Sequence, residues 1–499
     1  MAKLADAAKT LPAKPVADAL LQQFLLGVRP IYPLVHASSF QRQYNSCWQG
    51  AQRQCSAPPD DPTFICLVAA VLYCAAATMN VEDWQAEPLK DCPKMVMAVQ
   101  LRSALYNSLE VCGHQEKPTL HSLVSVLLAH SCTSEASGPF SCLKFVSMVS
   151  RIATSMGLHR DGPHTELGPV TLEIRRRVWW HILSMDAQAT ILNGSKPVFL
   201  PVAGDYDVPM VSTVHDDSLP GSPVARPTGS RSISISSKTS LVMLLATGHA
   251  EVGRFRGDLI QALQSRDGLH PKQVPMFSDQ LTRLNARLDS IISCMPTQGI
   301  PERGMLPSRF VNMSPRTNRT LYEDNASEPT ILAAWARIML TMVKSEAAIL
   351  FQKSLVGLEP PGYFDSAEAW ETLIGSCITY LRNLLQMLQT PAFSPWTWYF
   401  KAHYAPVQCI FIILTYLQDH HSSKAAEAAR YYADEIIELF APKGDDLVFG
   451  GPGGGQDDFT FAGKISKQMV SSWRAILMLR TKIYASDVSL QNNGLGIWE

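Results

Sequence analysis

Eleven cysteines are the first residues in this chain that could do chemistry, because closely spaced thiolates hold structural zinc. A zinc loop delivers two ligands from one turn, which requires cysteines about two to four residues apart. No two cysteines are separated by two residues here, and the nearest pairs, Cys47/Cys55 and Cys66/Cys74, are eight apart. We therefore predict no metal-binding residues and interpret the cysteines as reduced thiols that mostly fill the core.

The triplet His159-Arg160-Asp161 has the residue types of a kinase catalytic loop. Such a loop needs an asparagine five residues after the aspartate, and Glu166 stands there. The glycine-rich run at 450–455 does not fit the GxGxxG pattern, and neither a GxSxG elbow nor a GxxxxGK[ST] loop occurs. We predict no catalytic residues, no cofactor-binding residues, no cofactor and no enzymatic activity.

Arg175–Arg177 stand just before Trp179 and Trp180, and three guanidiniums in a row could bind phosphate or an acidic partner. The alternative is structural: the arginine stems pack along the tryptophans while the heads stay solvated or pair with Glu173 or Asp186. Adjacent residues on a helix point about 100° apart, so one tryptophan is expected in the core and the other in a neighbouring groove. The apolar residues interspersed along this segment favour the structural interpretation.

Two helices must position these side chains. Apolar residues at helical spacing from Phe145 to Met156 predict the first helix, which Gly157 ends. A polar loop follows, and the second helix runs through the Arg–Trp segment to Asn193-Gly194, since Pro197 cannot continue it. An extended tail leads on to Pro209.

The composition is that of a folded protein: 46% of the residues are hydrophobic and 17% charged, and the formal net charge is −1. A nearly neutral chain carries no global signal for nucleic acid or an anionic membrane. The N-terminus has no signal-peptide pattern. The apolar run Phe64–Met79 is too short for a transmembrane span and predicts a buried helix, so no membrane association is expected.

Helical patterns joined by short loops, without alternating strand patterns, predict an all-α fold: a large, irregular multi-helix domain with long Ser/Pro/Gly-rich loops. We expect a flexible N-terminal tail at 1–18, a first helical lobe at 19–208, a Ser/Pro-rich linker at 209–240, a second helical lobe at 241–486 and a C-terminal tail at 487–499. Helices in the second lobe are predicted at 331–352, 366–389, 396–418, 423–440 and 465–484.

The stretch 145–209 resembles the signature of the fungal-specific transcription factor domain, the middle homology region of fungal binuclear zinc cluster regulators. Order and spacing agree, and the weaker similarity extends over residues 19–440. The matching residues are Met156-Gly157-Leu158-His159-Arg160-Asp161, Glu173, Arg175-Arg176-Arg177-Val178-Trp179-Trp180, Asp186, Asn193-Gly194, Pro197 and the DYDVP sequence ending at Pro209.

The resemblance implies a nuclear regulator of transcription, and a secondary-metabolite gene cluster is a plausible setting. The family's zinc cluster lies upstream of this domain, whereas here the similarity begins about twenty residues after Met1 and the sequence contains no such cluster. We therefore expect DNA association to be indirect, through a DNA-binding or transcription-machinery protein, and consider a small-molecule effector. The oligomeric state stays open.

Two alternatives remain at this point. The sequence could be an incomplete version of a zinc cluster transcription factor, with the cluster encoded upstream. It could also be a helical small-molecule-binding protein or enzyme on the same scaffold, because pockets between helices are common.

Overall fold

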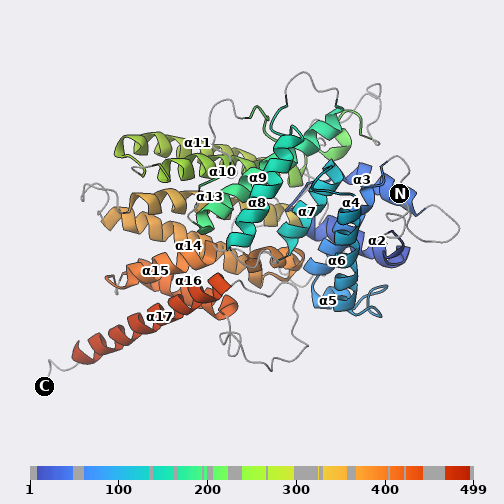
Figure 1. Cartoon of the computed structure of the whole chain (residues 1–499). Coiled ribbons are helices and arrows are strands. Elements are labelled where there is room, and N and C mark those ends of the chain that lie inside the picture. The colour runs from blue at the N-terminus through green and yellow to red at the C-terminus, as the bar shows by residue number, and fades with distance from the viewer. Residues whose placement is uncertain are drawn as a thin grey trace.

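The protein is almost entirely helical in the part that the structure describes, which confirms the predicted all-α fold (Figure 1). The one extended pairing among those residues is an antiparallel bridge between Val214 and Thr239. None of their helices is both long and apolar enough to cross a bilayer. The computed structural model describes residues 8–48, 61–133, 139–161, 167–193, 196–198, 206–222, 239–265, 268–296, 324, 330–356, 367–402, 405–420, 423–441 and 467–494.

Helix α4 (Phe64–Thr78) is the centre of the N-terminal helices, and each of its residues is buried, as its uniformly apolar sequence predicts. It packs against α6 and α7 and against the first helices of the chain. The elements of this region are α2 (Lys14–Gln23), the π-helix η1 (Phe24–Val28), α3 (Ala37–Cys47), α4, α5 (Val81–Trp84), α6 (Lys94–Val111) and α7 (Leu120–Cys132).

Helix α3 and the residue after it carry a row of aromatic rings: Phe40, Tyr44 and Trp48 are all buried, with successive ring centroids 6.1 Å and 5.8 Å apart. His36 caps the helix, because its ring accepts a hydrogen bond from the Ser39 amide at 3.2 Å. The unprotonated nitrogen of an imidazole can accept a hydrogen bond, as a serine hydroxyl oxygen can.

The middle of the chain supplies α8 (Pro139–Ser155), α9 (Pro169–Asn193), η2 (Asp216–Ser218), α10 (Leu241–Leu263), η4 (Pro271–Gln273) and α11 (Val274–Ser293). Helix α9 packs against α8 on one side and α10 on the other. Gly253 permits the second contact, since a Cβ there would lie 2.6 Å from the Ser184 hydroxyl of α9. The predicted helix end at Asn193 is confirmed, while Gly194 lies outside the described residues.

The later helices form successive layers beside α10 (Figure 1). Helix α13 packs against α10 and α14, and α14 packs against α15 and α16. The predicted helix 396–418 is wrong, because η6 is a 3₁₀ helix and α15 begins separately at Ala405. Pro406 explains the break, since proline fits the first turn of a helix and not its interior. The elements are α13 (Ile331–Leu355), α14 (Ala367–Gln389), η6 (Pro391–Ala402), α15 (Ala405–Leu417), α16 (Lys424–Phe440) and α17 (Lys467–Gly494).

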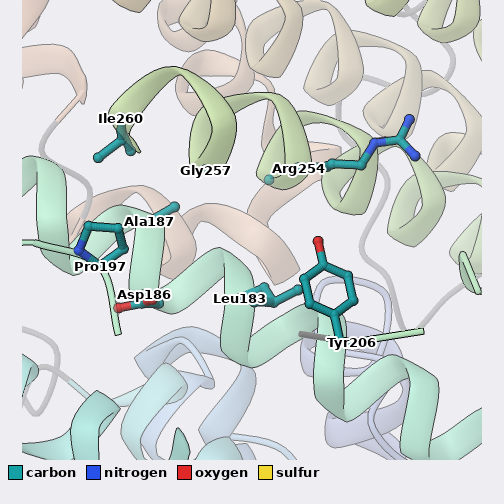
Figure 2. Close-up of a pocket in the computed structure, with 9 residues that line it drawn as sticks. Leu183, Asp186, Ala187, Pro197, Tyr206, Arg254, Gly257 and Ile260 are labelled. Atoms are coloured by element: carbon teal, nitrogen blue, oxygen red, sulfur yellow. The ribbon is translucent and has the colours of Figure 1, made fainter. Parts of the chain in front are cut away.

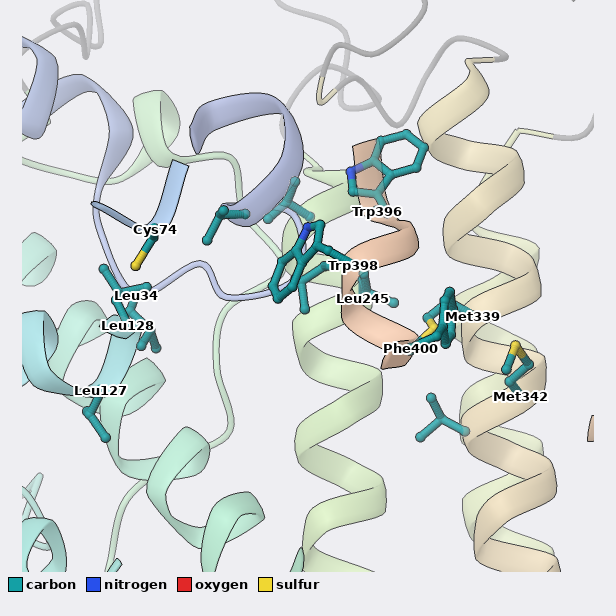
Figure 3. Close-up of a cluster of buried hydrophobic side chains, with 14 of the residues drawn as sticks. Leu34, Cys74, Leu127, Leu128, Leu245, Met339, Met342, Trp396, Trp398 and Phe400 are labelled. Atoms are coloured by element: carbon teal, nitrogen blue, oxygen red, sulfur yellow. The ribbon is translucent and has the colours of Figure 1, made fainter. Parts of the chain in front are cut away.

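Two tryptophans of η6 connect the end of the chain to its beginning. Trp396 Nε1 donates to the carbonyl of Leu26 at 2.9 Å, and Trp398 Nε1 donates to the carbonyl of Gly27 at 3.2 Å. A Cβ at Gly27 would stand 3.0 Å from the Pro395 carbonyl oxygen, so the contact needs glycine. Figure 3 shows both tryptophans within the buried cluster that also contains Leu34 and Leu245.

The predicted division into two lobes stays a prediction. Helix α2 begins at Lys14, within the segment expected to be a tail, and Ala8 and Ala17 are buried. Val208 and Val211 are also buried, at the edge of the predicted linker. Residues 223–238 of that linker, residues 297–323 and the glycine run 450–455 lie outside the described residues.

Candidate functional site

The first two arginines of the 175–177 run hold the end of α8 against α9. Gly157 ends α8 with φ of +69°, as its position predicted. The Arg175 guanidinium donates to the carbonyls of Met156 and Gly157 at 3.2 Å and 2.7 Å. Arg176 Nε donates to an Asp161 oxygen at 2.6 Å. Both heads are therefore engaged within the chain, where they fix the loop between the two helices.

The third arginine, Arg177, ends in a buried ion-pair cluster. Its Nη2 lies 2.8 Å from Asp216 Oδ1, and Arg29 Nη2 lies 3.0 Å from Asp216 Oδ2. All three side chains are at least 90% buried. Burial by itself would raise the pKa of Asp216, but the two guanidiniums outweigh it and hold this pKa below its usual range. Asp216 is therefore ionised and shared between two cations.

The Ala37 amide and the His36 ring, at the start of α3, also bond to Asp216. The Ala37 amide donates to its carboxylate at 2.9 Å, and His36 Nε2 lies 2.9 Å from its carbonyl oxygen. Because His36 Nδ1 accepts from the Ser39 amide, Nε2 must carry the proton and donate to that carbonyl. Asp216 thus connects the start of α3 with α9 and η1.

Two further carboxylates extend this cluster. Glu173 accepts from Arg177 Nε at 3.1 Å and from the Ser212 amide at 3.1 Å, and burial raises the pKa of Glu173. Asp324 lies 3.5 Å from Arg29 Nη1 and accepts from the Ser240 hydroxyl, the N-cap of α10. We call Arg29, Glu173, Arg177, Asp216 and Asp324 the ion-pair cluster.

The ion-pair cluster joins four segments that are distant in sequence, and the guanidiniums of Arg29 and Arg177 are both buried. Carboxylates of the chain itself already occupy the positions that a phosphate would take. The structural interpretation of Arg177 is confirmed by its pairing with Glu173, and its second partner is Asp216. Asp186 accepts instead from the Val198 amide at 3.0 Å.

Trp179 and Trp180 are both buried, and Tyr206 contacts both rings, with centroids 5.6 Å and 6.1 Å away. Trp180 Nε1 also donates to the Pro209 carbonyl at 2.8 Å. The segment that follows α9 is therefore folded back over the tryptophans. One of the two rings was expected in a neighbouring groove, whereas both are part of the buried core.

A small hollow of about 30 Å³, open to solvent, lies between α9 and α10 (Figure 2). Its walls are mostly apolar, with the Tyr206 hydroxyl and the Asp186 carboxylate as polar groups. A Cβ on Gly257 would meet no atom within 4 Å, so this glycine borders empty space. The lining residues are Leu183, Asp186, Ala187, Pro197, Tyr206, Gly253, Arg254, Gly257 and Ile260.

Sequence reasoning found the α9 side of the ion-pair cluster and missed Arg29, Asp216 and Asp324. No local pattern marks these three, because their burial depends on segments that meet only in the folded chain. Within the described ranges, no group of three or more His, Cys, Asp or Glu side chains could hold a metal ion. His159 and Asp161 of the kinase-like triplet serve the α8–α9 loop: the His159 carbonyl and the Asp161 amide both bond to Asp207.

Comparison with known proteins places this geometry in a family. Residues 21–263 match the family model described as "Fungal specific transcription factor domain". The chain is 40% identical over 439 residues to "Transcription factor macR" of Penicillium terrestre, and 32% identical over 443 residues to "Transcription factor yanR" of Aspergillus niger. Each alignment covers 86% of this chain, and respectively 50% and 44% of the relative.

A more distant relative is "Pyriculol/pyriculariol biosynthesis cluster transcription factor 1" of Pyricularia oryzae, 28% identical over 203 residues, which are 40% of this chain and 26% of the relative. The chain spans about half the length of the two more similar relatives. The family match includes α8, α9, the ion-pair residues Arg29 to Asp216 and all of α10. Residues 21–263, nearly half of this chain, therefore form a fungal specific transcription factor domain.

Proposed function

We propose that this chain regulates transcription in the nucleus, at genes of a secondary-metabolite biosynthetic cluster. The observation that carries the proposal is the similarity to two transcription factors along 86% of the chain. The biosynthesis-cluster regulator among the relatives supports the kind of target genes. A role as an enzyme is not part of this proposal, because the family and these relatives are regulators.

The chain acts on DNA through a protein partner in this proposal. The net charge of −1 gives no general attraction for DNA. The arginine run of α9 supports the same view, since Arg175, Arg176 and Arg177 bond to acceptors of the chain itself. Sequence-specific binding would need such side chains to reach phosphates and base edges.

Chromatin immunoprecipitation of the tagged chain, paired with a gel shift of the same purified chain, tests both parts. We expect promoter occupancy in cells and no shift by the purified chain alone. A shift at physiological salt would contradict the indirect mechanism and leave the regulatory role standing. Cytosolic residence without occupancy, or turnover of a pathway metabolite by the purified chain, would overturn the regulatory role itself.

A small-molecule effector is the second partner in this proposal, and the hollow between α9 and α10 is the place we assign to it. The apolar walls with one hydroxyl and one carboxylate suit one small apolar group of such a molecule, next to a hydrogen-bonding group. Products of the regulated cluster should raise the Tm of the chain. Gly257→Leu, which fills the hollow, should abolish that rise, and an unchanged rise would exclude this hollow.

A further inference from the structure

Two cysteines from different helices lie in contact at one end of the N-terminal helices. Cys66 stands in the first turn of α4, and Cys112 directly follows α6. Their sulfur atoms are 3.4 Å apart, although 46 positions separate them in the sequence. A disulfide needs about 2.05 Å between sulfurs, so a small side-chain movement would close the bond.

The two thiols differ in accessibility in a way that suits sequential oxidation. Cys66 is fully buried, while Cys112 is partly exposed. The turn after Cys112 begins with Gly113 at φ of +60°, and residues 115–117 of that turn are exposed. An oxidant can therefore reach Cys112 first, and the end of α6 can adjust toward the fixed sulfur of Cys66.

We propose that Cys66 and Cys112 form a reversible disulfide under oxidation, with Cys112 as the thiol that peroxide oxidises and Cys66 as the resolving thiol. Hydrogen peroxide oxidises the Cys112 thiol to a sulfenic acid and is itself reduced to water. The Cys66 sulfur then attacks the sulfenic sulfur. The S–S bond forms as the S–O bond breaks, and the hydroxide leaves with the Cys66 proton as a second water.

Burial raises the pKa of both thiols, and the Asp61 carboxylate raises that of Cys112 further. Little thiolate exists at neutral pH, so the oxidation is slow and its rate increases with pH. This places the pair among thiols that respond to sustained oxidative conditions. The product fixes the first turn of α4 to the end of α6.

The chain contains matched controls for accessibility. Cys377 of α14 and Cys409 of α15 are both buried, and Cys377 contributes to raising the pKa of Cys409, so these thiols are neighbours. Without an exposed member, this pair should stay reduced. Cys294 is exposed, so it shows how fast peroxide oxidises a solvent-accessible thiol of this chain.

The test treats the reduced, full-length protein with hydrogen peroxide, blocks remaining thiols with N-ethylmaleimide and maps the unreduced peptides by mass spectrometry. We expect an intramolecular peptide pair joining Cys66 to Cys112, its reversal by dithiothreitol and a higher Tm of the oxidised form. The yield should rise with pH. Cys294→Ser should leave the cross-link unchanged.

Two variants distinguish the roles of the sulfurs. Cys112→Ser should abolish the cross-link and leave Cys66 reduced. Cys66→Ala should leave a sulfenic acid on Cys112 that dimedone traps, which gives a positive signal in a folded protein. Conversion of wild-type Cys112 to sulfinic acid while Cys66 stays reduced would overturn the proposal, as would cross-linking of Cys377 to Cys409 in preference.

Discussion

Arg177 Nη2 lies 2.8 Å from Asp216 Oδ1, although 39 positions separate the two residues in the chain. Both side chains are 99% buried, and the carboxylate has a second cation in Arg29. Removing a carboxylate from water carries a desolvation penalty, and the attraction of well-positioned cations is needed to offset it. The stability of the fold around α9 therefore depends on Asp216, which lies outside the segment that is most characteristic in sequence.

Asp216→Asn should lower the free energy of unfolding by about 3–5 kcal/mol, because two buried guanidiniums lose their shared carboxylate. Urea unfolding followed by circular dichroism measures the change. The matched control is Asp289→Asn, which removes an exposed partner of Lys344 and should cost at most about 1 kcal/mol. Equal effects of the two substitutions would show that the ion-pair cluster adds nothing beyond a surface pair.

Trp179→Ala should cost about 3–5 kcal/mol, because the ring is 99% buried against Tyr206 and the core of α9. Trp180→Phe keeps an aromatic ring and loses the hydrogen bond to the Pro209 carbonyl, so its cost should be about 1–3 kcal/mol. Thermal unfolding and reporter-gene activity are measured together. A variant with full Tm and lost regulation would identify this helix as a contact surface.

Acid should destabilise the protein between pH 6.5 and 4 through two histidines. Burial lowers the pKa of His181 and of His130 to about 4. An unfolded histidine binds its proton near pH 6.5, at about the usual value. Between the two values the unfolded state binds more protons, so the free energy of unfolding falls with falling pH, by up to about 1.4 kcal/mol per pH unit for each histidine.

His181→Gln provides the check, since glutamine can keep a hydrogen bond to the Ser131 hydroxyl and does not titrate. Urea unfolding at a series of pH values should show a shallower slope in this window. Asp61 gives a contrast: its pKa is lowered to about 2 by His121, so its contribution is lost only as the pH falls from about 4 toward 2. An unchanged slope would mean that His181 titrates normally.

Two glycines of α10 should respond oppositely to alanine. Gly257→Ala should stabilise the protein by about 0.5–1 kcal/mol, because the new methyl meets no atom and alanine favours the helix. Gly248→Ala should destabilise it by about 1–3 kcal/mol, since the Cβ would lie 2.3 Å from Leu340 Cδ2 in the core. Chemical unfolding of both variants tests the assignment, and stabilisation by both would contradict the close packing at Gly248.

Local patterns predicted most helices, because the uniformly apolar run of α4 and the helical spacing of apolar residues in α13 each lie within one continuous segment. The break between η6 and α15 was not predicted, although Pro406 marks it in the sequence. Sequence reasoning also missed Asp216, whose burial requires Arg29 and Arg177 to arrive from distant segments. For the candidate site, the sequence predicted helix α9, whereas Arg29, Asp216 and Asp324 come together with this helix only in the folded chain.

The bonds from Trp396 and Trp398 to the carbonyls of Leu26 and Gly27 cross 370 and 371 positions of sequence. Carbonyls at a helix end need donors, and these arrive from residues that the ribosome adds after most of the chain is made. During synthesis, the carbonyls of Leu26 and Gly27 therefore gain these two donors only after η6 has been made, so the contact between the N-terminal helices and η6 forms late.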